Sequence, residues 1–396
     1  MRSNRLLKSA DALTGRAAFA ALGAYDRLRR ILRPFYLHAR TGTPSPSSIL
    51  AIKLCCLGDG ILAVPALRAL KTRWPEARLT MLCTTRDVDA FRRLNFIDDL
   101  VLLPVSGLGG PRELLAGGVE ALRILRRVRA ARPELAVDLD LYYRATPVLA
   151  YLSGAPLRVG FDTPGFDRAG LFTHSVVRDP DRWELECFLE VVAAAGAHSE
   201  DRQLEFPLSE ENLTSARGIL QEAGVEGPYI AMCPGSSRNW PQKQWPAERF
   251  AEVAQWAADS HEMSVVIVGA SYEQEIGEHV ADASRAVNLA GRTSLVETAA
   301  ILSTARALVT NDTGPMHLAC ALGTPVVAVF GPTNERKWGP RGPQDQVVLD
   351  DECPCRPCYT DSYMPDCQDR RCLERIPAQR VIEALDRALR RETASS

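Results

Sequence analysis

Short apolar runs alternate along most of the chain with segments in which apolar residues recur at helical spacing. The first run covers residues 49–54, and residues 60–73 then carry apolar side chains at Ile61, Val64 and Leu67. A short apolar run indicates a buried strand, whereas a period near 3.6 residues indicates an amphipathic helix. The pattern that follows predicts further strands and helices: strands at 78–83, 100–104 and 135–138, and helices at 88–94 and 113–131.

The same alternation restarts in the second half of the chain. It predicts helices at 210–223, 247–259, 272–283, 294–303 and 313–322, and strands at 229–233, 265–269, 286–289, 307–310 and 325–330. Strands that alternate with helices are typical of an open parallel sheet covered on both faces. We therefore predict two doubly wound, Rossmann-like α/β domains, 49–205 and 206–396, with a boundary near 201–208. Ligands of such sheets bind beyond the carboxyl ends of the strands, so two facing domains predict a central cleft.

Residues 1–48 differ from the rest. Nine basic residues within 1–40 are offset by only Asp11 and Asp26, while apolar residues recur there at helical spacing. A basic amphipathic helix can lie on an anionic membrane surface, but it can equally pack against the protein itself. The two alternatives stay open, and 41–48 is predicted to be a linker rich in Thr, Ser, Pro and Gly.

Composition narrows the class of protein. Of 396 residues, 46% are hydrophobic and 24% are charged, as in a globular protein, and the net charge of −2 gives no reason to expect a nucleic-acid partner. No apolar run approaches the ~20 residues of a membrane span, and no signal-peptide pattern is clear. Eleven cysteines in a chain of this length are expected to be free thiols or metal ligands. We expect a cytoplasmic location.

The first group of residues with chemical potential is Leu57-Gly-Asp59-Gly60, between the first predicted strand and helix. Asp59 would stand at the carboxyl end of the sheet, where a carboxylate can accept a proton from an attacking hydroxyl. An aspartate before a helix is also a common N-cap, and spacing alone favours that interpretation.

The second group runs from Asn311 to His317 and opens a predicted helix. The free N–H groups of a helix start, together with the helix dipole, suit a diphosphate. Thr313 can add a hydroxyl donor, and His317 lies about one turn further along. The competing interpretation is an N-cap aspartate at 312, a first-turn proline and a core histidine.

The third and fourth groups also follow strands. Ser236 and Ser237 lie in a glycine-containing loop, and Lys243 supplies a point charge for phosphate, although it could equally be a solvated loop lysine. Glu273 follows the strand that ends near Gly269. A carboxylate there can hold ribose hydroxyls, but it can also act as a partner of the helix dipole.

Together these motifs resemble glycosyltransferase family 9. The likeness rests on Leu50-Ala-Ile-Lys-Leu-Cys-Cys-Leu-Gly-Asp59, on Gly235-Ser-Ser, on Lys243-Gln-Trp-Pro and above all on the stretch 312–333, which begins Asp-Thr-Gly-Pro-Met-His. That family has the two-domain GT-B fold and includes the ADP-heptose:lipopolysaccharide heptosyltransferases. The resemblance spans about residue 49 to the end of the chain.

The resemblance implies a role for each matching residue. Asp59 matches the general base, and Lys243, Ser236 and Ser237 match the donor phosphate contacts. Glu273 matches the acid that binds ribose, and Thr293 lies near the backbone that contacts the base. The donor motif itself is matched by Asp312, Thr313, Gly314 and His317.

Two departures accompany the match. Gly60 stands where the family has a bulky apolar residue, which predicts a looser turn after Asp59. Two extra residues also separate Ser237 from Lys243.

Two further motifs suggest metals. The segment 353–372 holds Cys353, Cys355, Cys358, Cys367 and Cys372. Four thiolates can bind zinc, but this spacing matches no standard finger, and a structural role is favoured. Asp138-Leu-Asp140 resembles a metal-binding D-x-D motif. It falls on a predicted strand, where its carboxylates would alternate with Leu139 and serve as scaffold.

The sequence therefore predicts an inverting glycosyltransferase without a metal or other cofactor. Its expected partners are a nucleotide-sugar donor, by default ADP-heptose, and a glycan or glycolipid acceptor of the lipopolysaccharide type. The enzyme would be cytoplasmic, with a peripheral membrane contact through 1–40. Two alternatives share the fold: a non-catalytic nucleotide-sugar binding protein and a nucleotide-sugar epimerase.

Overall fold

The computed structural model describes residues 21–22, 45–54, 56–104, 111–360 and 363–390, except the side chains of 111–118. Most of the basic segment 1–40 thus lies outside the described residues. The chain divides into two compact units, Met1–Gln203 and Leu204–Ser396. In the described ranges no helix is long and apolar enough to cross a membrane.

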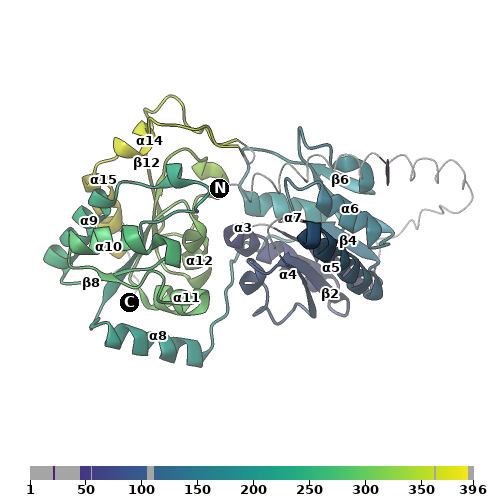
Figure 1. Ribbon diagram of the computed structural model, residues 1–396, viewed down its shortest axis with the longest axis horizontal. Helices are drawn as coiled ribbons and strands as arrows, with labels where there is room; N and C mark the ends of the chain where they lie inside the picture. Colours follow the sequence, from purple (N-terminus) through teal and green to yellow (C-terminus); the bar gives the residue numbers. More distant parts are fainter. Residues whose placement is uncertain (1–20, 23–44, 55, 105–110, 361–362, 391–396) are drawn as a thin grey trace, which may run out of the picture. The chain divides into compact units, whose positions relative to one another are not determined.

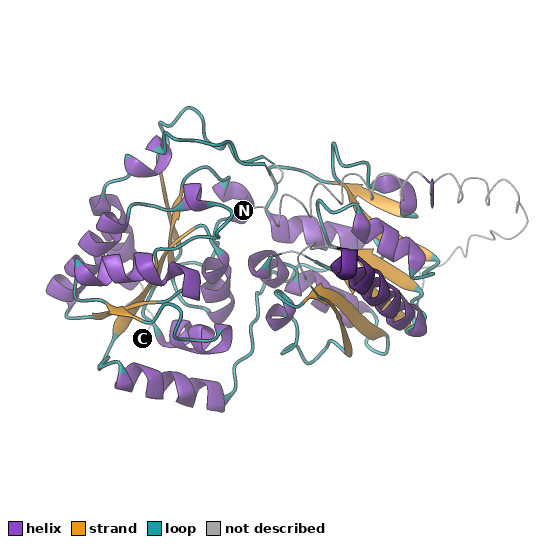
Figure 2. Ribbon diagram, viewed as in Figure 1, coloured by secondary structure: helices purple, strands orange, loops and turns teal. Residues whose placement is uncertain are grey.

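The first unit is built on a parallel sheet with the strand order β3-β2-β1-β4-β5-β6. Figures 1 and 2 show its strands with helices packed around them. Its strands are β1 (Ser48–Ile52), β2 (Arg78–Thr84), β3 (Asp99–Leu103), β4 (Leu135–Asp138), β5 (Leu157–Asp162) and β6 (His174–Val177). Its helices are α3 (Leu57–Leu62), α4 (Val64–Arg73), α5 (Pro111–Ala130), α6 (Ala145–Leu152) and α7 (Glu184–Ala194), with 3-10 helices at Val88–Ala90 and Ala169–Leu171.

Helices cover both faces of this first sheet. On one face, Leu50 and Ile52 of β1 join Ile124 and Val128 of α5 in a single buried cluster. Helices α4 and α7 pack together and cover the other face with α3. All residues of β1 are buried, and after Ser48 its sequence is continuously apolar instead of alternating, as expected for a central parallel strand.

The second unit repeats the same topology, with the strand order β12-β11-β10-β7-β8-β9. Its strands are β7 (Tyr229–Cys233), β8 (Ser264–Ile267), β9 (Val287–Asn288), β10 (Leu308–Asn311), β11 (Val326–Phe330) and β12 (Gln346–Leu349). Its helices are α8 (Glu210–Glu222), α9 (Ala247–His261), α10 (Gln274–Asp282), α11 (Leu295–Thr304), α12 (Gly314–Leu322), α13 (Glu335–Trp338), α14 (Arg371–Glu374) and α15 (Ala378–Arg390), with 3-10 helices at Pro241–Lys243 and Ser271–Glu273.

Alternate residues of the second sheet face its two helical layers. Met232, Val309 and Val329 share one core with residues of α9 and α15, such as Phe250 and Leu385. Helices α11 and α12 lie on the opposite side of this sheet (Figure 1). The two α/β sheets of the predicted fold class are therefore confirmed.

Both sheets reverse their strand order at one point. In the first sheet the reversal falls between β1 and β4, and in the second it falls between β7 and β10. Helices that leave such neighbouring strands go to opposite faces, so a crevice opens at the carboxyl ends. The segments that directly follow these four strands contain Asp59, in the first turn of α3, and the loop residues Asp140, Ser236 and Asp312.

The structure corrects two of the predicted helices. The helix expected at 60–73 is two helices, because α4 begins with Pro65 in its first turn, and proline cannot donate the backbone hydrogen bond of a continuous helix. The helix expected at 88–94 is only the 3-10 turn Val88–Ala90.

Candidate functional site

Asp59 lies inside the first turn of α3, not at its N-cap. The N-cap is Cys56, and no side chain caps this helix. The alternative in which Asp59 merely starts the helix is therefore wrong. Its carboxylate Oδ2 instead lies 3.7 Å from the Nζ atom of Lys53, the residue directly after β1.

Gly60 packs tightly behind Asp59. A Cβ at this position would lie 3.1 Å from the Cβ of Ala90 and 3.2 Å from Cζ of Phe91. The glycine is buried and lets the loop after β2 approach α3 closely. The predicted loosening of this turn is thus wrong, since the missing side chain is replaced by Phe91.

The D-x-D motif belongs to the same end of the sheet. Asp138 is the last residue of β4 and Asp140 follows it, so the two do not alternate along a strand as predicted. Asp138 pairs with Arg168 at 2.7 Å, and both side chains are fully buried. Burial raises the pKa of Asp138 to about 6, because Arg168 offsets only part of the desolvation.

In Asp140, the effect of burial on the pKa is outweighed by neighbouring cations and hydrogen bonds. Its Oδ2 accepts a hydrogen bond from the Leu54 N–H at 3.0 Å and lies 3.9 Å from Lys53 Nζ. Burial raises its pKa, but Lys53 and then Arg168 outweigh this, and the net pKa lies below the ordinary value. Asp140 is therefore an anion inside the protein.

In the second unit, Lys243 and Asp312 form an ion pair. Lys243 Nζ donates to Asp312 Oδ2 at 2.7 Å. Burial raises the pKa of Asp312, yet the neighbouring Lys243 and a hydrogen bond to Thr333 bring it below the ordinary value. Asp312 is not an N-cap either, because the N-cap of α12 is Thr313, whose side chain makes no capping hydrogen bond. Despite the two extra residues before it, Lys243 thus reaches the motif that begins at 312.

Asn311, which begins the second predicted group but was given no role of its own, joins the two loops. Its Oδ1 accepts from the Trp245 N–H at 3.0 Å, and its Nδ2 donates to the carbonyls of Pro234 and Gly235 at 2.8 and 3.0 Å. A buried amide satisfied on both sides fixes one loop geometry. The loop that carries Ser236 is therefore bound to the start of α12.

The predicted donor motif, which begins at residue 312, continues into the first turn of α12. Gly314 is its first residue, Pro315 follows in the first turn, and His317 is buried. His317 lies close enough to Asp312 to lower the pKa of that carboxyl, although less than Lys243 does. Thr313, Gly314 and His317 are thus gathered with Lys243 and Asp312.

The two serines of the loop differ. The Ser236 hydroxyl is buried and donates to the Trp240 carbonyl at 3.0 Å, so it holds the loop together. Ser237 is exposed, and its Oγ accepts from the Asn239 N–H at 3.4 Å. Ser237 is therefore the better placed of the two to contact a ligand.

Glu273 lies against this loop, whereas Thr293 does not. The Glu273 carboxylate accepts from the Ala270 N–H at 2.7 Å, and a Cβ on Gly235 would overlap it. Burial raises the pKa of Glu273. Thr293 follows the edge strand β9, two strands from β7, and its hydroxyl lies 2.8 Å from that of Thr298.

A cluster of aromatic rings beside Lys243 was not predicted from the sequence. The Lys243 ammonium lies 5.5 Å from the centroid of the Tyr359 ring, which also packs edge-on against Trp240 and Trp338. The Tyr359 backbone is held by the Pro332 carbonyl at 2.9 Å. No spacing in the sequence connects Tyr359 with Lys243, because the contact depends on how the cysteine-rich segment folds back.

The two ends of the cysteine-rich segment pack in the core, whereas Cys355 is exposed and Cys358 and Cys367 are partly buried. Cys353 and Cys372 belong to the main buried cluster of the second unit. Burial, and then the nearby cysteines, raise the pKa of Cys372 to about 12, which keeps it a thiol. Cys353 and Cys355 have their sulfur atoms 3.5 Å apart. Among the described side chains, no three His, Cys, Asp or Glu residues are grouped so that they could hold a metal ion.

The cysteines are mostly free. Nine of the eleven are free thiols, whereas Cys56 is disulfide-bonded. The prediction of thiols is therefore wrong at Cys56.

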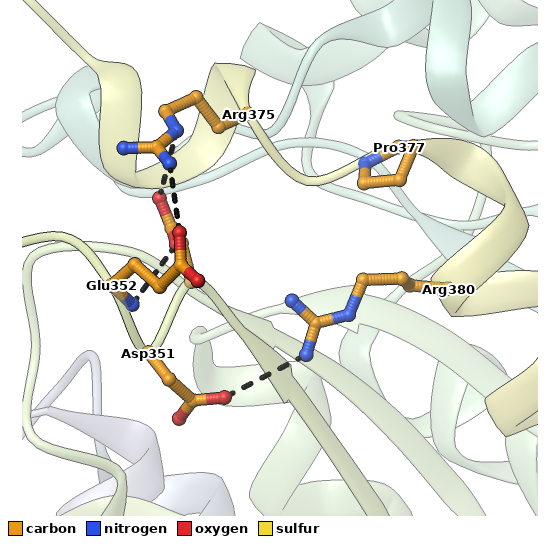
Figure 3. A pocket seen from close by; sticks show the side chains of 6 residues that line it. Asp351, Glu352, Arg375, Pro377 and Arg380 are labelled. Atoms are coloured by element: carbon orange, nitrogen blue, oxygen red, sulfur yellow. Dashed lines mark hydrogen bonds and ion pairs between the residues drawn. The ribbon is translucent and has the colours of Figure 1, made fainter.

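Figure 3 shows a surface pocket beyond the edge strand β12. Arg375 pairs with Asp350 and Glu352, and Arg380 pairs with Asp351. None of the predicted site residues lines the pocket, and it lies beyond an edge strand, away from the switch point of the sheet. It is therefore not the candidate site.

Comparison with known proteins identifies the chain. Residues 121–365 match the model of glycosyltransferase family 9 (heptosyltransferase). The chain belongs to this family. It is thus a glycosyltransferase and not a binding protein or an epimerase, and the predicted resemblance is confirmed.

Individual relatives agree over most of the chain. Lipopolysaccharide heptosyltransferase 2 of Salmonella typhimurium is 27% identical over 314 residues, which cover 76% of this chain and 87% of the relative. A solved family 9 glycosyltransferase from Veillonella parvula has a TM-score of 0.73 at 24% identity, covering 87% of this chain and 97% of that one. The ADP-heptose lipopolysaccharide heptosyltransferase II of E. coli has a TM-score of 0.68 at 22% identity, with coverages of 87% and 99%. These two structures share the fold with the family 9 enzyme described here.

Proposed function

We propose that this family 9 enzyme transfers a heptose from ADP-heptose to a hydroxyl of a lipopolysaccharide-core acceptor, with inversion at the anomeric carbon and without a metal. The observation that carries the proposal is the pairing of Lys243 with Asp312 at the start of α12. It joins a fixed cation to a helix N-terminus at the switch point of the second sheet, which is an arrangement suited to a diphosphate. The named relatives support the choice of sugar, nucleotide and acceptor.

In the proposed reaction, Asp59 acts on the acceptor. Its carboxylate takes the proton of the acceptor hydroxyl while that oxygen attacks the anomeric carbon of the heptose. Attack from the face opposite the leaving group forms one new C–O bond and breaks the bond to the diphosphate, so the configuration inverts. The side chain of Asp59 is 20% exposed, which leaves it accessible to such a hydroxyl.

On the donor side, the departing ADP gains negative charge. Lys243, the exposed Ser237 hydroxyl and the N-terminus of α12 would stabilise that charge. Asp312 orients the ammonium, and Glu273 is assigned to the ribose by its place beside the loop at Gly235. Thr293 is assigned to the base. Because positive potential is already provided, the step does not need a divalent ion.

The direct experiment is turnover of purified enzyme with ADP-heptose and a heptose-free core acceptor. We expect release of ADP together with one glycosidic bond, whose anomeric configuration, read by NMR coupling constants, is opposite to that of the donor. A product with retained configuration would contradict the mechanism. Matched reactions with UDP- and GDP-sugars test the nucleotide, and equal turnover of all three donors would contradict the preference for ADP.

Chelation tests the absence of a catalytic metal. Activity is expected to persist in EDTA, because Lys243 and the α12 dipole replace a cation. Restoration of lost activity by added Mg²⁺ or Mn²⁺ would contradict this. Zinc content and the unfolding temperature are measured on the same samples, since chelation at a structural site would act through folding instead.

The basic segment 1–40 is proposed to hold the enzyme on the cytoplasmic face of an anionic membrane, where a lipid-linked acceptor lies. Basic residues near such a surface contribute ~1 kcal/mol each at low salt. Deletion of 1–40 is expected to reduce co-sedimentation with anionic vesicles and to leave turnover of a soluble acceptor unchanged. Equal vesicle binding by both forms would contradict the membrane role, and loss of soluble-acceptor turnover would indicate a part of the fold.

A further inference from the structure

Lys53 is a lysine within an otherwise apolar segment at the carboxyl end of β1. Its side chain is 1% exposed, and its Nζ lies 3.7 Å from Asp59 Oδ2 and 3.9 Å from Asp140 Oδ2. Its backbone N–H donates to the Leu82 carbonyl at 3.0 Å, so the residue is fixed by the sheet. A buried ammonium is costly unless carboxylates surround it, and here they do.

The side chain of Lys53 is an ammonium at neutral pH. Burial lowers its pKa, but Asp140 and then Asp59 raise it above the ordinary lysine value. Asp87 and Glu184 act in the same direction. Because Asp140 also lies beside Lys53, its negative charge offsets part of the positive charge that Lys53 exerts on Asp59.

Asp140 is itself fixed by deeper residues. It accepts the Leu54 N–H, and its own N–H donates to Asp138 Oδ1 at 2.9 Å. Arg168 donates to Asp138 Oδ2 at 2.7 Å and to the Asp140 carbonyl at 2.8 Å. A chain of charged groups thus runs from the fully buried Arg168 to Asp59, and Asp59 is its exposed end.

We propose that Lys53 is a positioning residue for the general base: it holds Oδ2 of Asp59, so that Oδ1 is directed at the acceptor hydroxyl. This inference rests on the proposed function, in which Asp59 takes the acceptor proton. Asp59 lies in a six-residue helix whose start no side chain caps, and Lys53 pairs with its carboxylate from inside the sheet. Small errors in such a position are costly, since a displacement of about 1 Å can cost ~10²-fold in rate.

The same proposal gives the D-x-D motif a task. Asp140 holds Lys53 and Asp138 holds the Asp140 backbone, so the motif supports the base from inside the first unit. Its carboxylates are paired with lysine and arginine side chains, which occupy the positions that a metal cation would take.

The test uses the full-length enzyme and the substitution Lys53→Met, which keeps the length and apolar character of the chain. We expect kcat to fall on the order of 10–100-fold, by the cost of a misplaced base, while the ADP dissociation constant and both KM values change less than about threefold. The decisive measurement is the double variant with Asp59→Ala. If Lys53 acts through Asp59, Lys53→Met has no further effect on the residual rate of Asp59→Ala.

Arg158→Met is the matched control. Arg158 is another buried cation of the first unit, but it donates to the carbonyls of Ala155 and Leu171 at 2.7 and 2.8 Å. We expect this variant to lower the unfolding temperature and to leave kcat unchanged. Asp140→Asn provides a second probe if Lys53→Met does not fold, and it should lower kcat by a smaller factor that also vanishes in the Asp59→Ala background.

The possible outcomes distinguish a failure of the positioning role of Lys53 from a failure of the proposed function. Wild-type kcat in Lys53→Met, or in Asp140→Asn if only that variant folds, overturns the positioning role while Asp59→Ala remains inactive. Multiplicative losses in the double variant also overturn it, because they indicate a structural role. If Asp59→Ala itself turns over normally, the proposed function has failed, and the role of Lys53 fails with it.

Discussion

The two switch points hold the same pair of residues in opposite orientation. In the first sheet the lysine is the buried partner, with Lys53 1% and Asp59 20% exposed. In the second sheet the carboxylate is the buried partner, with Asp312 7% and Lys243 17% exposed. One unit therefore presents a carboxylate to its surroundings and the other presents an ammonium.

This inversion follows from where the lysine lies in the sequence. Lys53 directly follows a central strand, where its side chain is enclosed by the sheet and its helices, whereas Lys243 ends a 3-10 turn in the loop after β7. In each pair the less exposed charge lies against the more exposed one. The same topology can therefore present either a carboxylate or an ammonium, depending on which member of the pair is buried, and these are the two groups that the proposed reaction assigns to the base and to the anion contact.

The largest effect is expected from Asp59→Ala. We expect kcat to fall ~10²–10⁴-fold, the usual contribution of a general base, with ADP affinity within a few-fold of wild type. ADP release and calorimetric titration measure the two quantities. Because Asp59→Ala leaves the buried Lys53 with one carboxylate fewer, the unfolding temperature should fall, and activity is compared at a temperature where both proteins are folded. Wild-type turnover by this variant would show that the first unit does not supply the base through Asp59, and the comparison of the two units would then fail.

A smaller and different effect is expected from Lys243→Met. The variant should lose ~10²-fold in kcat/KM and should bind ADP more weakly, because in the proposed reaction the cation contacts the nucleotide both before and after transfer. Lys243→Arg should keep part of the affinity. Arg249→Met, which removes an exposed cation paired with Glu252 on α9, is the control and should change neither value. Unchanged ADP affinity in Lys243→Met would contradict the assignment.

The smallest effect concerns stability and pH. Burial raises the pKa of Glu184 to about 7, despite Arg178, from an ordinary 4.5. The folded state thus binds more protons than the unfolded state between these values. The contribution of Glu184 to the free energy of unfolding is therefore present at low pH and is lost as the pH rises through about 7.

The measurement for this prediction is thermal unfolding between pH 5 and 8. Wild-type enzyme should lose several degrees over this range by the linkage relation, and Glu184→Gln should lose less. Asp138, with a pKa of about 6, acts in the same direction in both proteins. The lowered pKa values of Asp140 and Asp312 affect stability only in acid, so they do not contribute to the slope over this range. If the unfolding temperature falls equally with pH in wild type and in Glu184→Gln, the prediction is wrong.

Much of the fold could be predicted because it is encoded locally. The apolar run at 229–233 and the strand β7 coincide, as do 135–138 and β4. Predicted helices fail where a local feature overrides the periodicity, as Pro65 does at the start of α4. The place of the 312–317 motif in the fold was predictable for the same reason, since Thr313 and Gly314 stand at a strand-to-helix junction that the sequence marks directly.

What the sequence alone determined is the alternation of strands and helices, the places where loops follow strands, and the residue types in those loops. Which charges meet was decided only by the tertiary structure: Lys243 bonds Asp312 across 69 positions, and Asp140 reaches the backbone of Leu54 across 86. The physical reason is the strand order. Parallel pairing of β1 with β4 and of β7 with β10 places distant carboxyl ends side by side, and no local period specifies that pairing.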